Sequence, residues 1–392
     1  MLDIGPSRNP YHIATRHLVS RQLASALPLM PRRPVTQSDA DNFRAFEVDD
    51  ATTRAAVNDL VTLVNVDATS GQEAAISEAF VAFGERLGLP VERVRVTEGR
   101  DNILFGDPHP SLVFCTHMDT VPPHFGAACD AYAVSGRGSA DAKGVAVAMA
   151  YALKLLRESG GGEGVACWFV VGEETDHAGA KAMLDHPHQP KTVVLGEPCG
   201  GMPARGQKGL LKLRLRAQGS AAHSAYPELG VSATHALIQA LSALIQAELP
   251  EDRTALGQTT LNVGLVSGGL AANVVAPSAE AVVLIRCAAP VDAIMTAVAS
   301  TIEGCLGPTI EIEELNRAEP LEFSCDPREL GIEPGDPVPF NTDAHTLRPM
   351  NARMLLMGPG DMRTCHGPDE HLPIAELRKA IENYAKLAVR LR

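Results

Sequence analysis

The sequence predicts an α/β fold in which helices flank a mixed, mainly parallel sheet, with a smaller α+β domain inserted into it. Short, continuous apolar runs such as Val165–Val171 and Thr192–Leu195 alternate with segments of helical periodicity. Such runs are typical of strands that are buried on both faces of a parallel sheet. From Gly209 the pattern changes, because apolar and charged residues alternate over Leu211–Arg216. This alternation predicts a strand with one face in water, in a second and different sheet.

The larger domain begins near residue 51, where apolar residues first recur at helical spacing. A glycine-rich loop precedes a long helix, and Ser159–Gly162 ends it. In chain order we expect a helix over Thr52–Asn65, a helix over Gln72–Leu87, strands over Asn102–Phe105 and Leu112–Thr116, a helix over Gly144–Glu158, the two apolar strands already given, a late strand over Arg353–Met357 and a closing helix over Ile374–Leu391.

The middle of the chain has the element order β-α-β-β-α-β, which is that of a ferredoxin-like sandwich. We expect a strand from Gly209, a helix over Val231–Ala247, strands over Thr259–Val266 and Ala279–Cys287, a helix over Val291–Leu306 and a strand over Thr309–Leu315. The order predicts an inserted domain over residues 208–316, within a larger domain formed by residues 46–207 and 317–392.

The first 45 residues differ in composition from the rest of the chain. Between Ile4 and Ser38 there are five arginines and no acidic residue. Three interpretations stay open: a transit peptide, an upstream start codon, or a poorly ordered basic tail. We expect residues 1–45 to form a basic extension outside the fold.

Composition limits the classes of function. Hydrophobic residues make up 45% and charged residues 21% of the 392 residues, as in a globular enzyme. The net charge of −13 argues against nucleic acids and anionic membranes as partners, since both select basic patches. No apolar run approaches the ~20 residues of a membrane-spanning helix. The eight cysteines include no C-x-x-C pair, which favours reduced thiols and a cytoplasmic location.

The apolar run Leu112–Thr116 is followed by His117 and, two residues later, by Asp119. A strand of this kind carries the imidazole to its C-terminal end, where the aspartate can accept the second ring N–H. Such a pair fixes the tautomer of a metal ligand and raises its basicity. A histidine at a strand end is also common without a metal, so this motif alone leaves both interpretations open.

Asp141 stands in the glycine-rich segment Gly136–Gly144, just before a predicted helix. It could be the helix N-cap, a role worth about 1 kcal/mol to the helix. It could also be a carboxylate that bridges two cations. The segment is not a phosphate-binding P-loop, because it lacks the Gly-Lys-Ser/Thr ending. Considered by itself, the segment favours the cap.

Two more carboxylate motifs follow predicted strands. Glu173 and Glu174 come just after Val165–Val171, and repulsion between adjacent carboxylates raises a pKa unless cations compensate it. The alternatives are a solvated acidic turn, or a metal ligand at Glu174 beside a general base at Glu173. Glu197 follows the strand Thr192–Leu195 in the same way.

His366 belongs to the last motif, after Gly358-Pro359-Gly360 and before Pro368-Asp369-Glu370. A lone histidine in a loop is usually polar surface. Together, however, the five segments provide two histidines, an aspartate that can bridge and two glutamates. Imidazole plus carboxylate ligation suits Zn²⁺ and its neighbours such as Co²⁺ and Mn²⁺.

In this order the motifs resemble those of the M20 metallopeptidase family, which includes acetylornithine deacetylases, succinyl-diaminopimelate desuccinylases, aminoacylases and glutamate carboxypeptidases. The resemblance extends from about residue 50 to the C-terminus. It implies a zinc-exopeptidase-like sheet whose inserted ferredoxin-like domain serves as a lid and dimerises. It also implies two divalent metal ions, with Zn²⁺ expected first and Co²⁺ or Mn²⁺ as alternatives. The matching stretches are His117–Pro122, the loop around Asp141, Gly172–Glu174, Gly196–Pro198 and His366.

The resemblance also implies the roles of the clustered residues. Asp119 orients the histidine next to it, and Glu173 activates the water that bridges the two ions for attack on an amide carbonyl. The implied metal ligands are His117 and Glu197 for one ion, Glu174 and His366 for the other, and Asp141 as the bridge between them.

Three further residues match the family in the inserted domain. His223 fits the family's lid histidine, which is expected to reach a partner subunit's active site and stabilise the oxyanion. Without the family it is a histidine in a turn. Asn273 and Arg286 fit the positions that bind the substrate carboxylate, for which arginine offers two parallel hydrogen bonds. An ordinary surface arginine is the alternative for Arg286.

The resemblance favours hydrolysis of the amide of N-acyl-L-amino acids, as in an acetylornithine deacetylase-like enzyme. A dipeptidase or carboxypeptidase and a succinyl-diaminopimelate desuccinylase are the alternatives, and a catalytically inactive binding homologue is the remote one. The expected substrate is thus a small N-acyl amino acid or a short peptide. The expected assembly is a homodimer through the inserted domain.

Overall fold

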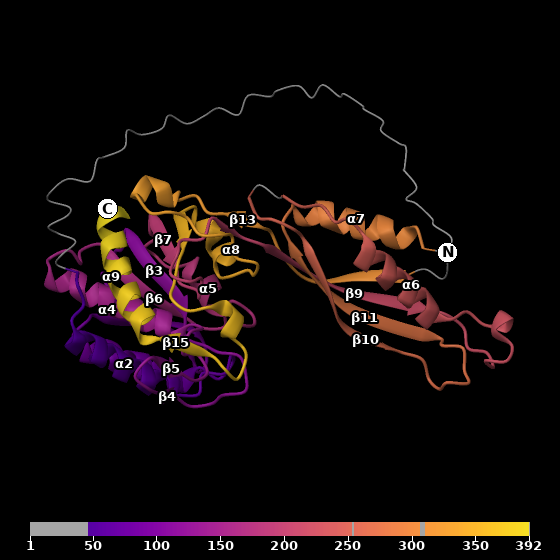
Figure 1. The fold of residues 1–392 in the computed structure, drawn as a ribbon, viewed down its shortest axis with the longest axis horizontal. Coiled ribbons are helices and arrows are strands. Elements are labelled where there is room, and N and C mark those ends of the chain that lie inside the picture. The colour runs from indigo at the N-terminus through magenta and orange to yellow at the C-terminus, as the bar shows by residue number, and fades with distance from the viewer. Residues whose placement is uncertain (1–45, 253–254, 306–309, 392) are drawn as a thin grey trace, which may run out of the picture. The chain divides into compact units, whose positions relative to one another are not determined.

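A computed structural model describes residues 46–252, 255–305 and 310–391. These ranges form two main sheets, each with its own helices (Figure 1). The basic extension predicted over residues 1–45 lies outside the described residues. Among the helices described, none combines the length and the apolar composition that a membrane crossing requires.

The first sheet has six strands in the order β1-β2-β6-β3-β7-β14. Three of its strand pairs, β6/β3, β3/β7 and β7/β14, are parallel, whereas β1/β2 and β2/β6 are antiparallel. The prediction of a mixed, mainly parallel sheet is therefore confirmed. The strands are β1 (Val91–Thr97), β2 (Arg100–Gly106), β3 (Leu112–His117), β6 (Val165–Val170), β7 (Thr192–Leu195) and β14 (Arg353–Leu356).

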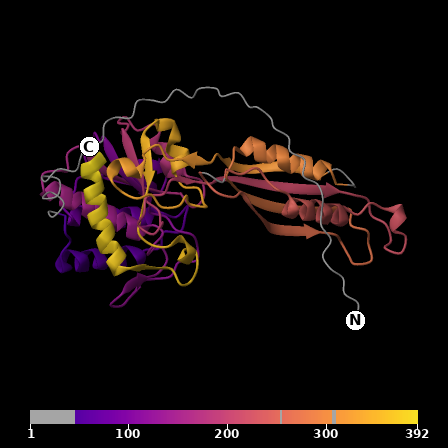
Figure 2. The ribbon, with the colours of Figure 1, turned by 45° about the horizontal axis from the view of Figure 1, so that its top comes forward.

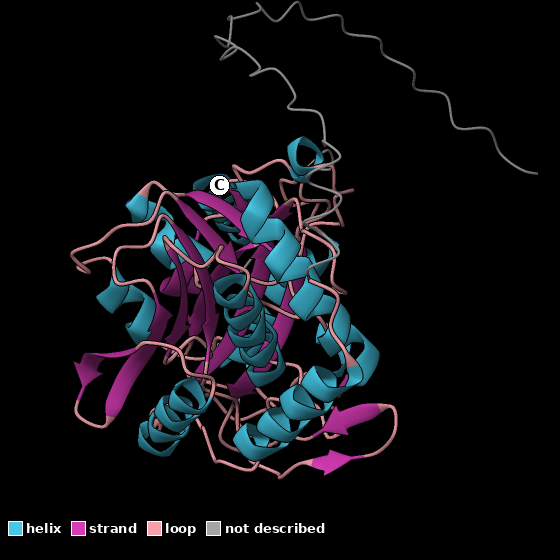
Figure 3. Cartoon of the chain, turned by 90° about the vertical axis from the view of Figure 1, so that its left-hand side faces the viewer, coloured by secondary structure: helices cyan, strands magenta, loops and turns pink. Residues whose placement is uncertain are grey.

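Helices cover both faces of this sheet (Figure 3). One face packs against the larger group of helices: α2 (Asp50–Val64), α3 (Ala74–Arg86), α4 (Lys143–Glu158) and α9 (Ile374–Leu391). The other face packs against α5 (Ala178–Met183) and α8 (Ala344–Leu347).

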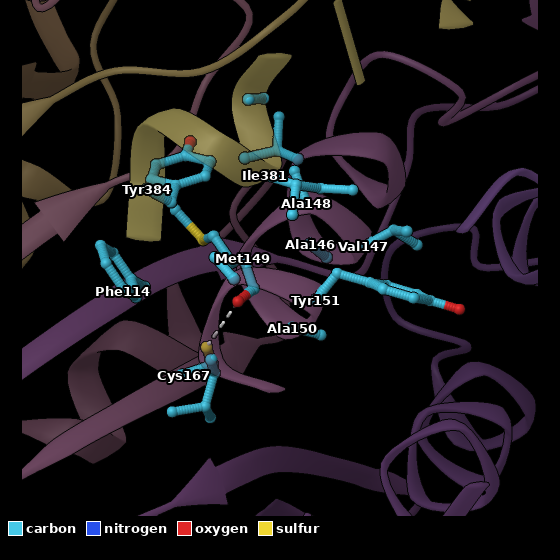
Figure 4. Packing of buried hydrophobic residues seen from close by; sticks show 14 of the residues in the cluster. Phe114, Ala146, Val147, Ala148, Met149, Ala150, Tyr151, Cys167, Ile381 and Tyr384 are labelled. Carbon is cyan, nitrogen blue, oxygen red and sulfur yellow. Dashed lines mark hydrogen bonds between the residues drawn. The ribbon is translucent and has the colours of Figure 1, made fainter. Parts of the chain in front are cut away.

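Helix α4 is the buried centre of the larger core. Its residues from Ala146 to Tyr151 belong to a buried cluster that also contains Phe114 of the sheet and Ile381 of α9, as the close view shows (Figure 4). From α9, Tyr384 packs edge to face against Phe114 of β3, with ring centroids 5.3 Å apart, and its hydroxyl donates to the main-chain oxygen of Met357. This packing supports the end of β3, where His117 lies, and the start of α4, which Asp141 precedes.

The second sheet is antiparallel, in the order β10-β11-β9-β12. Side chains of β9 alternate between buried and accessible, as the sequence pattern predicts. Two helices pack together on one face of the sheet and share its core, and Figure 2 shows them along the strands. The elements are β9 (Gly209–Gln218), α6 (Ala233–Gln246), β10 (Thr260–Gly268), β11 (Ser278–Cys287), α7 (Val291–Glu303) and β12 (Ile310–Ala318).

Two small sheets complete the described part of the fold. The three-stranded sheet β15-β5-β4 brings the chain before α4 next to the chain before α9. Its strands are β4 (Ala128–Cys129), β5 (Ala133–Ser135) and β15 (His371–Pro373), and the two-stranded sheet consists of β8 (Gly206–Gln207) and β13 (Leu321–Glu322). Short 3₁₀ turns cover Pro227–Leu229, Pro327–Leu330, Arg348–Met350 and Met362–Thr364.

Candidate active site

Three of the predicted site segments lie at one edge of the six-stranded sheet. His117 is the last residue of β3, and the neighbouring parallel strands β6 and β7 lead through short turns to Glu173 and Glu197. Because the carboxyl ends of parallel strands meet at one edge, the side chains that follow them come together there.

Asp141 lies between two imidazoles. Its Oδ1 is 3.1 Å from Nε2 of His117, and its Oδ2 is 3.2 Å from Nε2 of His366. The N-cap residue of α4 is Ala142. The interpretation of Asp141 as the helix N-cap is therefore wrong, because its buried carboxylate faces the two histidines instead.

Each of the two glutamates stands beside a different histidine. Oε1 of Glu174 is 2.9 Å from Nε2 of His366, and Oε2 of Glu197 is 4.0 Å from Nε2 of His117. One ligand atom each of His117, Asp141 and Glu174 lies within 4.8 Å of the other two. The structure thus brings all five residues predicted as metal ligands into one cluster.

Asp119 ties the end of β3 to the turn that carries the two glutamates. Nδ1 of His117 donates to the main-chain oxygen of Asp119 at 2.8 Å, whereas the carboxylate is 3.6 Å away. The carboxylate instead accepts from the hydroxyl of Ser70 and from the main-chain N–H groups of Glu173 and Glu174. The nearest acceptor of the ring N–H is therefore the main chain of Asp119, not the side chain that the sequence pattern suggests.

The charges in the cluster are unbalanced. Burial, followed by the nearby carboxylate of Glu197, raises the pKa of Glu173 well above its ordinary value. Burial likewise raises the pKa of Glu197. Hydrogen bonds to Asp141 and Glu174 raise the pKa of His366 to about 10. The cluster therefore holds more negative charge than its histidines neutralise, which favours a bound cation.

His177 and Asp343 join Glu173, and sequence reasoning missed both. One ligand atom of each of the three lies within 4.8 Å of the others, and Nδ1 of His177 is 2.8 Å from Oδ1 of Asp343. His177 stands near the two glutamates but in no motif, with a left-handed φ of 53°. No local signal links it to Asp343, which is 166 positions further along the chain.

A cavity of about 320 Å³ lies against this cluster. Its wall includes the carboxylates of Asp141, Glu173, Glu174 and Glu197 and the imidazole of His366. Residues of the second sheet, Leu210, Arg286 and Asn316, contribute to the same cavity, and Nη1 of Arg286 donates to the side-chain oxygen of Asn341 at 3.2 Å.

His223 and Asn273 lie elsewhere. Both are exposed and neither lines this cavity. Their segments lie together, because the N–H of Ser224 donates to the main-chain oxygen of Asn273 and His223 forms a bridge with Val274. Of the three residues predicted in the inserted domain, the structure therefore brings only Arg286 to the cluster.

A mixed α/β sheet with a cluster of imidazoles and carboxylates at its carboxyl edge is typical of metal-dependent hydrolases. Residues 113–390 match the profile of peptidase family M20/M25/M40, and the chain belongs to this family. It is thus a metal-dependent peptide hydrolase, and the resemblance found in the sequence is confirmed.

Relatives and solved structures agree with this assignment. A probable carboxypeptidase of Aspergillus flavus is 32% identical over 83% of this chain and 85% of its own. A tripeptidase of Staphylococcus aureus has a TM-score of 0.72 at 21% identity, covering 86% of this chain and 98% of its own. A dinuclear metal-binding M20 peptidase of Bacillus subtilis has a TM-score of 0.64 at 15% identity, covering 88% and 99%. The two structures share the fold.

Proposed function

We propose that this chain is a two-metal peptidase that cleaves the amide bond next to the terminal carboxylate of a short peptide. One observation carries the proposal: a single cavity is lined by four of the five ligand candidates, by Glu173 and by Arg286. The four are Asp141, Glu174, Glu197 and His366. The Aspergillus flavus relative is named a probable carboxypeptidase, which supports a peptide substrate.

The residues of the cluster fit divalent metal ions. Both ring nitrogens of His117 face an acceptor, the main-chain oxygen of Asp119 and the carboxylate of Asp141. Burial lowers the pKa of His117, but hydrogen bonds with Asp119 and Asp141 outweigh it and raise this pKa well above its ordinary value, so the metal-free ring carries both N–H protons. A divalent cation between the ring and Asp141 would take the place of the proton on Nε2. We propose that His117 and Glu197 would hold one ion, Glu174 and His366 the other, and Asp141 both. The donor set suits Zn²⁺ first, with Co²⁺ or Mn²⁺ as alternatives.

In this proposal, Glu173 is the general base. Bound divalent ions polarise a carbonyl oxygen and make water a stronger acid. The raised pKa of Glu173 suits a group that accepts a proton from the attacking water and returns it to the leaving amine. His177, whose Nδ1 is 2.8 Å from Oδ1 of Asp343, lies beside this carboxylate.

We further propose that Arg286 holds the carboxylate of the substrate. Among the described residues that line the cavity, it is the one lysine or arginine. Its planar guanidinium can form two parallel hydrogen bonds with a carboxylate. An N-acyl amino acid presents the same carboxylate next to the same amide. Acetylornithine deacetylase-like hydrolysis of N-acyl-L-amino acids is therefore the second candidate.

A homodimer is the assembly that we propose. β10 is an edge strand, and Leu265 and Val266 on it are exposed. An exposed edge strand with apolar side chains pairs readily with a second copy of itself. Such a pair would let His223 and Asn273, which lie away from their own cavity, act at the site of the partner.

The test uses the purified chain loaded with Zn²⁺ or Co²⁺ and a panel of dipeptides, tripeptides and N-acetyl amino acids, each with its C-terminal amide as a matched control. We expect hydrolysis of the free acids and little hydrolysis of the amides. Glu173→Ala should lower kcat at least about 100-fold, as expected for loss of a general base. The proposal is wrong if no substrate is cleaved, or if the variant equals the wild type.

A further inference from the structure

Arg137 and Glu370 form an ion pair that is closed off from solvent. Their side chains are 2% and 0% exposed, and Nη1 of Arg137 is 2.6 Å from Oε2 of Glu370. Arg137 precedes Asp141 by four residues, and Glu370 follows His366 by four. Strands β5 and β15, which pair with each other, bring the two segments side by side. The ion pair thus joins the segment that carries Asp141 to the segment that carries His366.

The second oxygen of Glu370 holds the main chain that carries Asp141. Oε1 accepts from the N–H groups of Gly138, Ala140 and Asp141 at 2.9, 3.3 and 3.1 Å. All three belong to the loop between β5 and α4. A single carboxylate oxygen of Glu370 therefore holds the main chain of this loop up to and including Asp141.

Arg137 holds the main chain of His366 in the same way. Its Nη2 donates to the main-chain oxygen of His366 at 3.3 Å, and its Nε donates to that of Pro123 at 3.4 Å. The guanidinium also lies 4.9 Å from the ring centroid of Phe125. His366 has a φ of 62°, which a residue with a Cβ adopts only when its surroundings hold it. The hydrogen bond from Arg137 is one such restraint.

We propose that Arg137 and Glu370 are positioning residues that set the spacing between the Asp141 carboxylate and the His366 imidazole, and so the affinity of the site for divalent metal. The inference rests on the proposed function. A buried ion pair adds little net stability compared with apolar residues, so its burial here is better explained by the geometry that it imposes. Groups that orient metal ligands typically change metal affinity 10–100-fold when they are replaced.

The experiment measures the affinity of the metal-free protein for Co²⁺ from the absorption bands of the bound ion, with Zn²⁺ competition as a second assay. Glu370→Gln and Arg137→Met change the local charge in opposite directions. A purely electrostatic role predicts weaker Co²⁺ binding in the first variant and tighter binding in the second. Positioning predicts that both variants bind Co²⁺ about 10–100-fold more weakly, with altered absorption bands.

Asp59→Asn is the matched control. Asp59 accepts from Arg86 and from the hydroxyl of Tyr151, so this variant breaks a different and more exposed ion pair, between α2 and α3. We expect it to lower the unfolding temperature and to leave Co²⁺ affinity unchanged. An equal loss of Co²⁺ affinity in this control would show that the effect is general loosening and would overturn the proposal.

Other outcomes are equally decisive. Wild-type affinity in both variants, or tighter binding in Arg137→Met, overturns the positioning role. If Arg137→Met does not fold, Arg137→Lys is used in its place. Lysine keeps the positive charge but lacks the planar guanidinium, so we again expect weaker Co²⁺ binding. If the wild type itself binds no Co²⁺ or Zn²⁺, the proposed two-metal function fails, and that failure is visible before any variant is compared.

Discussion

Arg286 stands at the end of β11, on a sheet that holds none of the five ligand candidates, yet it lines their cavity. Its hydrogen bond to Asn341 links that sheet to the segment before α8. A charged group that reaches across in this way can orient a substrate relative to the ions. The carboxylate of the substrate is the complementary partner, because the rest of the wall is strongly acidic.

Replacing Arg286 with lysine keeps the charge but removes the planar fork. We expect kcat/KM for substrates with a free carboxylate to fall about 10–150-fold, since charge-assisted hydrogen bonds contribute about 1.5–3 kcal/mol. Steady-state kinetics on matched acid and amide substrates measure the effect. An equal loss on the amide, which has no carboxylate to hold, would contradict the role given to Arg286.

We expect His366 to make the proposed metal binding depend on pH. Its pKa of about 10 in the metal-free protein means that the imidazole is protonated at neutral pH. The proton must leave before Nε2 can bind an ion, so we expect metal affinity to rise with pH up to about 10. The same shift stabilises the metal-free fold fully below the ordinary pKa of 6.5, and this contribution is lost as the pH rises through about 10.

Calorimetry with Zn²⁺ in buffers of different ionisation enthalpy counts the protons released. The wild type should release at least part of a proton from His366 at pH 7, and His366→Gln should release fewer. Metal affinity that stays constant between pH 6 and 9, without proton release, would refute the prediction.

At the scale of elements, β10 decides the proposed assembly. Leu265 and Val266 are 67% and 59% exposed on this edge strand. Val266→Lys places a charge in the proposed contact, so we expect the dimer to dissociate in sedimentation experiments. Tyr132→Lys is the control, because Tyr132 is 81% exposed but lies outside the second sheet. A monomeric wild type, or a Val266→Lys dimer, would rule out this interface.

The strands at the centre of the first sheet and its edge strand β14 were predictable, whereas the opposite edge strand, β1, was not. β3, β6 and β7 are continuous apolar runs because both of their faces are buried, and such runs are visible in the sequence. Sequence analysis predicts no strand at β1, which is an edge strand with mostly accessible side chains. Helix α5 is also absent from the prediction, since six residues carry too little periodicity to be detected.

For the whole molecule, the ions connect folding to function. A ligand at 100 times its Kd stabilises the folded state by about 2.7 kcal/mol. We expect a chelator to abolish activity and to lower the unfolding temperature, and Zn²⁺ to restore both. Glu173→Ala keeps all five ligand candidates, so it should show the same thermal shift without activity. Identical melting curves with and without chelator would argue against the metal site.

The sequence by itself determined the α/β class and the positions of the buried strands along the chain, because these depend on local patterns of apolar and charged residues. It also provided the motifs that resemble a metallopeptidase family. Only the tertiary structure decided which partners each side chain meets. Asp141 fits a helix N-cap in its own segment, and it faces two imidazoles because His366, far along the chain, folds back beside it. Contacts of this kind, like those of Glu370 with the Asp141 loop, join distant segments and leave no periodic trace in the chain.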